Sequence, residues 1–135
     1  MPVAYITRRA VFSAAHRLHS DSLNEVENDA LYGKCNNPYG HGHNYVLEVT
    51  VKVEIDPING MVMNLTDLKA IIERRLLSHM DHRHLNLEVP FFEGIVPTAE
   101  NIAYVCWREL ARELTSLYEV KIYETENNYA LYRGD

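Results

Sequence analysis

Seven histidines in a chain of 135 residues are the first sign of chemistry. Two of them flank a glycine in His41-Gly42-His43, at the entry to an alternating apolar segment. Residues two apart on a strand point to the same face, so both imidazoles could converge on one metal ion. His16 would supply a third nitrogen if its strand pairs antiparallel with that of His43. Three histidines with an open fourth position describe a catalytic zinc site, although His-x-His on its own is a weak signal.

Three polar side chains elsewhere are candidates for acid–base chemistry. Cys35 lies next to Lys34, and a positive charge or a nearby dication would favour its thiolate; the alternative is a loop cysteine without a role. Asp81 directly precedes His82, and a carboxylate can orient an imidazole and stabilise its charged form. Polar pairs are also common at helix ends, so this pair alone does not establish a proton relay.

Glu124 is predicted to occupy an apolar face. By strand alternation it points the same way as Val120 and Ile122, where a buried carboxylate needs a partner. An arginine from elsewhere in the protein would satisfy it, and a position at the edge of the core would not need one. A ligand that offers two parallel N–H groups, as a guanidine-like edge does, would satisfy it equally.

Hydrophobic periodicity predicts the elements that position these residues. In chain order they are a strand over 5–18, a polar loop over 21–42, a strand over 43–54, a helix from Asn64 to about Ser78, a helix from Thr98, and a hairpin over 120–133 with its turn near 127–128. The predicted fold is α+β, a four-stranded antiparallel sheet with two helices on one face, in the order ββααββ. The second face of such a sheet must either face water or be covered by copies of the chain.

Composition limits the class of protein. Residues 1–135 are expected to form a single domain, and 47% hydrophobic with 24% charged residues is an ordinary globular balance. No apolar run is long enough to span a membrane, residues 1–9 lack an apolar signal core, and two cysteines suit a reducing cytoplasm. The net charge of −6 argues against nucleic-acid binding, because phosphate backbones are met by basic surfaces. It does not exclude a local basic pocket for a small anion.

Six segments of the chain, in order, resemble the 6-pyruvoyl-tetrahydropterin synthases of the eukaryotic type. They are FSAAHRL at 12–18, GKCNNP leading into GHGHNY at 33–45, VMNLTDL at 62–68, LSHMDHRHL at 77–85, PTAEN at 97–101 and YETENN at 123–128. The resemblance implies that family's tunnelling fold, with a homohexamer of two stacked trimers whose sheets close into a barrel.

The resemblance also implies a reaction. It is the zinc-dependent conversion of 7,8-dihydroneopterin triphosphate to 6-pyruvoyl-tetrahydropterin, with elimination of triphosphate, in tetrahydrobiopterin biosynthesis. The enzyme would be a carbon–oxygen lyase acting on phosphate. The redox change is internal to the substrate, in agreement with the absence of a Gly-rich dinucleotide motif. A magnesium ion could accompany the triphosphate, and no carboxylate cluster in the sequence marks its site.

Roles implied by the resemblance fall on matching positions. The zinc ligands would be His16, His41 and His43, and the general base would be Cys35. The base would be served by a relay of Asp81 and His82 from a neighbouring subunit.

The substrate-binding roles implied by the resemblance lie in the C-terminal half. Glu124 would anchor the pyrimidine edge of the pterin, and Thr98 and Glu100 match residues of the pterin pocket. Many animal members have a second threonine where this chain has Ala99, which therefore receives no binding role. The triphosphate would be met by basic side chains, with Arg8, Arg9, Arg17 and Lys34 as unranked candidates.

Two alternatives stay open at this point. The carboxy-tetrahydropterin synthases of deazapurine biosynthesis share the fold, the zinc and a similar cysteine, but they typically have three residues between cysteine and histidine where this chain has five, between Cys35 and His41. A non-catalytic zinc- or pterin-binding module is the second alternative. Such a module would not need Cys35, Asp81, His82 and Glu124 together.

Overall fold

Two long antiparallel strands form the centre of the fold. In the computed structural model, which describes residues 1–135, β1 (Val3–His16) pairs with β2 (His41–Glu54) along their full lengths, from Val3 opposite Glu54 to His16 opposite His41. From Tyr45 to Val51, every second residue of β2 is fully buried, as the alternating sequence predicts. Both predicted strands are confirmed, and each begins two residues earlier than expected.

The sheet has five strands in the order β3-β1-β2-β4-β5. The predicted hairpin is confirmed as β4 (Leu117–Thr125) and β5 (Asn128–Tyr132), with β4 antiparallel to β2. The expectation of a four-stranded antiparallel sheet is wrong, because a two-residue strand, β3 (Arg83–His84), runs parallel to β1. Two hydrogen bonds hold this segment against β1 at the edge of the sheet. The amide of Ser13 donates to Oδ1 of Asp81 at 2.9 Å, and the amide of His82 donates to the carbonyl of Ser13 at 2.6 Å.

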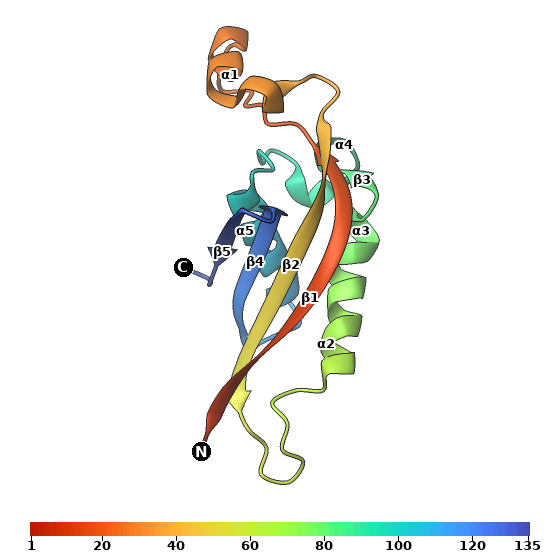
Figure 1. The fold of residues 1–135 in the computed structure, drawn as a ribbon, viewed down its shortest axis with the longest axis vertical. Helices are drawn as coiled ribbons and strands as arrows, with labels where there is room; N and C mark the ends of the chain where they lie inside the picture. Colours follow the sequence, from red (N-terminus) through yellow and green to blue (C-terminus); the bar gives the residue numbers. More distant parts are fainter.

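Two helical segments pack against the sheet. The first consists of α2 (Leu65–Ile72), a π-helical turn, η2 (Glu73–Leu77), and α3 (Ser78–Met80), so it ends two residues beyond the predicted end. The second is α5 (Ala99–Ala111), which Thr98 caps by accepting a hydrogen bond from the amide of Asn101. Figure 1 shows α2 alongside β1 and α5 behind β4. Their buried side chains form one core with those of β2 and β4, and the α+β class is confirmed.

Short elements connect the main ones. They are α4 (Leu85–Glu88) and η3 (Pro90–Phe92), which join β3 to the segment before α5. No helix in the chain has both the length and the apolar composition needed to cross a membrane.

The segment between β1 and β2 is not the loop that its polar composition suggested. It contains α1 (Glu25–Tyr32) and a 3₁₀-helix, η1 (Gly33–Asn36). A capping box begins α1: Oδ1 of Asn24 accepts from the amide of Glu27 at 2.8 Å, and the Glu27 carboxylate accepts from the amide of Asn24 at 2.9 Å. Figure 1 shows α1 standing beyond the ends of β1 and β2, apart from the helices that cover the sheet.

The sheet face opposite the helices carries both polar and apolar side chains. Arg9, Glu48 and Lys121 lie side by side on β1, β2 and β4, and the hydroxyls of Thr7 and Thr50 are 2.7 Å apart. Tyr5 and Val11 of β1 are exposed on the same face, so it is mixed in character.

Candidate metal and substrate site

The three predicted histidines meet at the upper end of the central strand pair. His16 and His41 are cross-strand partners, and their Nε2 atoms lie 3.1 Å apart. The ring centroid of His43 is 5.2 Å from that of His16 and 4.9 Å from that of His41. With a carboxylate oxygen of Glu124, one nitrogen from each histidine falls within 4.8 Å of all the others. We call these four residues the His/Glu cluster.

The protonation of the histidines suits metal binding. Nδ1 of His16 lies 2.8 Å from the carbonyl oxygen of Pro97, which can only accept, so Nδ1 carries the proton and Nε2 keeps a free lone pair. Burial lowers the pKa of His16, against the opposing effect of the Pro97 carbonyl, and burial also lowers the pKa of His41. Both imidazoles are therefore neutral at pH 7, the form that binds a metal.

The cluster fits a zinc ion by its donors and spacing. Two imidazole nitrogens on one tetrahedral zinc would lie about 3.3 Å apart, close to the 3.1 Å between His16 and His41. Nε2 of His43 is buried and has no hydrogen-bond partner, which coordination of a cation would remedy. Three nitrogens and one oxygen form a donor set that zinc accepts.

Glu124 enters the cluster from β4. Its neighbours of the same parity, Val120 and Ile122, are fully buried, as predicted. Oε1 of Glu124 is 3.1 Å from Nε2 of His43, at an angle that makes no hydrogen bond. The carboxylate therefore has a histidine neighbour and no arginine partner. The structure places an oxygen of this carboxylate within 4.8 Å of a nitrogen from each of the three histidines.

The turn before His41 requires glycine. Gly40 has φ +77°, and a Cβ there would lie 2.7 Å from Nε2 of His84 and 2.9 Å from the carbonyl oxygen of His16. At Gly42 an added methyl group would lie nearest to the Ala14 carbonyl oxygen, at an ordinary 3.6 Å.

We expect Gly40→Ala to lower the free energy of unfolding by about 2 kcal/mol, from the left-handed backbone and the contact with the His16 carbonyl. Gly42→Ala, the matched control, should stay within about 0.5 kcal/mol of wild type. Urea denaturation of both variants checks this. Equal stabilities of the two variants would contradict the packing described for this turn.

A pocket of about 470 Å³ lies next to the cluster and contains the predicted pterin-binding residues. Its lining consists of Leu18, Thr98, Ala99, Glu100, Glu124, Thr125, Asn128, Tyr129 and Ala130. Glu124 thus belongs both to the His/Glu cluster and to the pocket wall. Ala99 also lines the pocket, so the second threonine hydroxyl of many animal members is missing from this wall.

Cys35 and the Asp81–His82 pair occupy different places in one chain. Cys35 is half-buried in η1, where its carbonyl accepts from the amide of Leu18 at 2.8 Å. Oδ1 of Asp81 is 3.0 Å from Nδ1 of His82, whose side chain is 83% exposed. No hydrogen bond or ion pair joins either residue to Cys35 or to the cluster.

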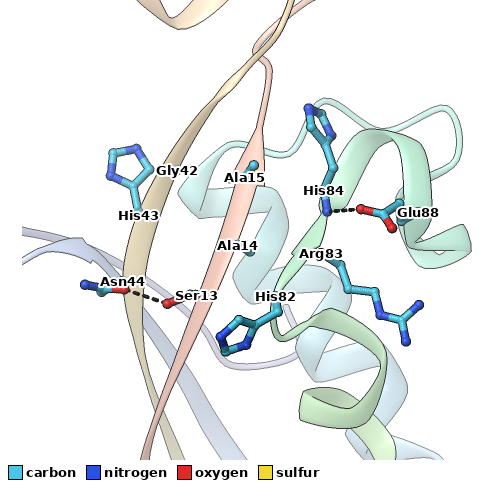
Figure 2. A pocket seen from close by; sticks show the side chains of 10 residues that line it. All are labelled: Ser13, Ala14, Ala15, Gly42, His43, Asn44, His82, Arg83, His84 and Glu88. Atoms are coloured by element: carbon cyan, nitrogen blue, oxygen red, sulfur yellow. Dashed lines mark hydrogen bonds between the residues drawn. The ribbon is translucent and has the colours of Figure 1, made fainter.

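Figure 2 shows the surroundings of the exposed histidine. His82 lies beside β1 in a pocket of about 440 Å³ near Ser13 and Asn44, while the ring of His43 projects beyond β2. The structure therefore brings Asp81 and His82 together, and His82 lines the same pocket as His43, although no hydrogen bond or ion pair joins it to the His/Glu cluster of the same chain.

Sequence reasoning missed two groups that support the site. The Pro97 carbonyl, which orients His16, is a backbone atom 81 residues away along the chain and leaves no sequence signal. Asn36, next to Cys35, is only 5% exposed. A signal was present in the Asn36-Asn37 pair, since asparagines often bind backbone groups in turns.

Comparison with known proteins points to one family. The family model described as 6-pyruvoyl tetrahydropterin synthase matches residues 5–135. The 6-pyruvoyl tetrahydrobiopterin synthase of Poecilia reticulata is 53% identical over 135 residues, covering 98% of this chain and 92% of that protein. The protein of the same name from Homo sapiens is 51% identical over 134 residues, with the same coverage. The solved structure of Caenorhabditis elegans 6-pyruvoyl tetrahydropterin synthase matches with a TM-score of 0.96 at 43% identity, covering 100% of this chain and 98% of that one.

A relative named for the carboxy-type reaction is less similar than the Poecilia reticulata and Homo sapiens proteins. A putative 6-carboxy-5,6,7,8-tetrahydropterin synthase of Archaeoglobus fulgidus is 32% identical over 122 residues, covering 90% of this chain and 89% of that protein. The difference agrees with the five-residue spacing between Cys35 and His41.

Proposed function

Because the chain belongs to the 6-pyruvoyl tetrahydropterin synthase family, we propose that it converts 7,8-dihydroneopterin triphosphate to 6-pyruvoyl-tetrahydropterin. The reaction eliminates triphosphate, depends on zinc, and makes the protein a carbon–oxygen lyase of tetrahydrobiopterin biosynthesis. The observation that carries the proposal is the position of Glu124, which joins a three-histidine cluster to a pocket of about 470 Å³.

In this proposal His16, His41 and His43 hold the zinc ion. When bound, zinc supplies Lewis acidity, which withdraws electron density from the side-chain oxygens of the substrate and so acidifies the adjacent C–H bonds. The lowered pKa values of His16 and His41 support this role, because they keep both ligands neutral. The Pro97 carbonyl holds His16 in the tautomer that presents Nε2.

Glu124 orients the pterin ring. Its carboxylate accepts two parallel N–H groups from the pyrimidine edge, a charge-assisted and bidentate contact. Thr98 and Glu100 border the same pocket, so the ring would lie against the start of α5. With the ring in that position, the side chain of the substrate extends toward the three histidines.

Cys35 acts as the general base, and its thiolate removes a proton from a side-chain carbon of the substrate. The ring gains the hydrogens that the side chain loses, and the C–O bond to triphosphate breaks. Asp81 and His82 relay the protons, supplied by a neighbouring subunit. The exposure of His82 and its contact with Asp81 support this role, because an exposed and oriented imidazole is accessible to a second copy.

In this proposal each subunit is one domain over residues 1–135. Six subunits form a homohexamer of two stacked trimers, whose sheets close into a barrel. The protein acts in the cytoplasm. The outer edge of β1 is paired only at Ala14 and Ala15, so most of this 14-residue strand offers free hydrogen-bonding groups to another copy. The row of Arg9, Glu48 and Lys121 would then face a water-filled interior.

The triphosphate is expected to reach basic side chains, with magnesium as part of the bound substrate. Arg8, Arg9, Arg17 and Lys34 are the candidates. Two of them lie near Cys35: Nε of Arg17 donates to the carbonyl of Asn36 at 2.9 Å, and Lys34 directly precedes Cys35 in η1.

Product analysis tests the proposal. The zinc-loaded protein is incubated with 7,8-dihydroneopterin triphosphate, and the pterins are separated by chromatography with electrochemical detection. We expect 6-pyruvoyl-tetrahydropterin together with released triphosphate. A carboxylated pterin would instead assign the chain to the deazapurine-related enzymes, and the absence of any product would favour a binding module.

Glu124→Gln separates two roles for this carboxylate. As the pterin anchor, Glu124 contributes a charge-assisted hydrogen bond, so kcat/KM should fall by about 10- to 100-fold while one zinc per chain is retained. Steady-state kinetics and metal analysis on the same preparation measure both quantities. Loss of zinc from the variant would identify Glu124 as a metal ligand instead, and unchanged kcat/KM would exclude the anchor. The neighbouring exposed Glu126→Gln is the control.

A further inference from the structure

The segment that carries Cys35 is not held by an apolar core. From residue 17 to residue 40 only two side chains are buried, and both are asparagines, Asn28 and Asn36. Helix α1 packs mainly on η1 and stands beyond the sheet (Figure 1). The place of Cys35 must therefore be set by hydrogen bonds rather than by hydrophobic packing.

The two asparagines have different roles. Oδ1 of Asn28 accepts from the amide of Ser20 at 2.8 Å, and its Nδ2 lies within 3.0 to 3.2 Å of the carbonyls of Ser20, Leu23 and Asn24. All of these contacts are local to the segment. Asn28 therefore shapes the segment without linking it to the sheet.

Asn36 makes the link. Its Nδ2 donates to the carbonyl of Leu18 at 2.8 Å and lies 3.0 Å from Nδ1 of His19. In return, the amide of Leu18 donates to the carbonyl of Cys35 at 2.8 Å, and Nε of Arg17 donates to the carbonyl of Asn36. These four contacts join the Cys35 turn to the three residues that directly follow His16, the last residue of β1.

We propose that Asn36 is a positioning residue for Cys35, which fixes the thiol relative to the His/Glu cluster through the backbone of residues 17–19. The inference rests on the proposed function in one respect, the role of Cys35 as the base. The Leu18 carbonyl, which can only accept, requires an N–H donor. A side chain without an N–H group would leave the Leu18 carbonyl unpaired and the turn free to shift.

The test compares Asn36→Ala and Asn36→Asp with the exposed neighbour variant Asn37→Ala. Asn36→Asp keeps the shape of the side chain but has no N–H donor. We expect kcat to fall by roughly 10- to 100-fold in both Asn36 variants, because small displacements of reacting groups reduce rates by this order. Zinc content should stay near wild type and KM should change less than kcat, since none of the four contacts involves the side chain of Glu124 or of a cluster histidine. Asn37→Ala should behave as wild type.

Alkylation of Cys35 by iodoacetamide gives a readout that is independent of activity and is also measured on the metal-free protein. Cys106 is an internal reference, because burial raises the pKa of its thiol to about 12 and leaves it unreactive. A released turn exposes Cys35, so its alkylation should be several-fold faster in both Asn36 variants. If Asn36→Ala does not fold, the alkylation rate of Cys35 in Asn36→Asp tests the positioning role.

The outcomes are distinct. Wild-type alkylation rates in a folded Asn36 variant would overturn the positioning role, whatever the kinetics show. A lower melting temperature with unchanged kcat and unchanged alkylation would assign Asn36 a structural role only, and would overturn it as well. If the wild-type protein formed no pyruvoyl product, the proposed function would fail, while the alkylation rates would still support or refute the link between Asn36 and Cys35.

Discussion

Cys35→Ala is expected to lower turnover by about 10²- to 10⁴-fold, the usual contribution of a general base, while zinc stays bound. The expectation follows from the separate attachments of the two groups. Cys35 lies in η1, outside the His/Glu cluster, whose residues come from β1, β2 and β4. Removing the thiol therefore removes a proton acceptor and no metal ligand. Steady-state turnover and zinc per chain are measured on the same sample.

The second cysteine provides the matched control. Cys106 is buried in α5 and belongs to the core, so Cys106→Ala should cost some stability and leave turnover unchanged. Cys35→Ala with wild-type turnover would remove the assigned base and support a binding module instead.

The neighbouring-subunit relay makes a related prediction for mixtures. Subunits of Cys35→Ala and of His82→Ala are each expected to be inactive. Reassembled together, they should recover part of the activity, because some interfaces would join an intact Cys35 to an intact His82. Recovery of no activity from verified mixed assemblies would contradict a relay shared between subunits.

His41→Ala is expected to abolish both zinc binding and turnover. The side chain of His16 is fully buried, whereas that of His41 is less buried. Replacing His41 therefore tests the role of the metal with less damage to the core. Only two of the three proposed histidine ligands would remain, too few to retain zinc through dialysis, and the proposed Lewis acid would be lost. Metal analysis after dialysis and the product assay check both effects.

Thermal unfolding adds a readout that does not depend on the reaction. Zinc at 100 times its Kd should stabilise the wild-type protein by about 2.7 kcal/mol, because it binds only the folded state. The same zinc should leave His41→Ala unchanged. The control is His79→Ala, which replaces an exposed histidine outside the cluster. Equal stabilisation of wild type and His41→Ala by zinc would contradict the assigned ligands.

The site was predictable wherever alternation decides which way a side chain points. His16, His41, His43 and Glu124 lie on one face of the sheet because strand geometry places every second residue there. Helix caps at Asn64 and Thr98 were predictable in the same local way, since each accepts from an amide two or three residues ahead.

Other features depend on contacts between segments that are distant in sequence. Strand β3 exists because Asp81 and His82 bond to Ser13, 68 or more residues earlier, and a two-residue strand has no periodicity. Helix α1 was missed because its buried side chain is an asparagine rather than an apolar stripe. Its capping box of Asn24 and Glu27 was the signal that could have revealed it. The sequence could not show which of its several asparagines positions Cys35, because the hydrogen bond from Asn36 to the Leu18 carbonyl appears only in the folded chain.

The most direct test of a zinc-dependent 6-pyruvoyl-tetrahydropterin synthase is turnover of 7,8-dihydroneopterin triphosphate by one preparation in three states. The protein is assayed as loaded with zinc, after removal of zinc by a chelator, and after stepwise return of zinc. We expect the pyruvoyl product and triphosphate to disappear with the metal and to return in proportion to zinc, reaching the original rate at one ion per chain. Undiminished formation of the pyruvoyl product by the zinc-free protein would contradict the role assigned to His16, His41 and His43.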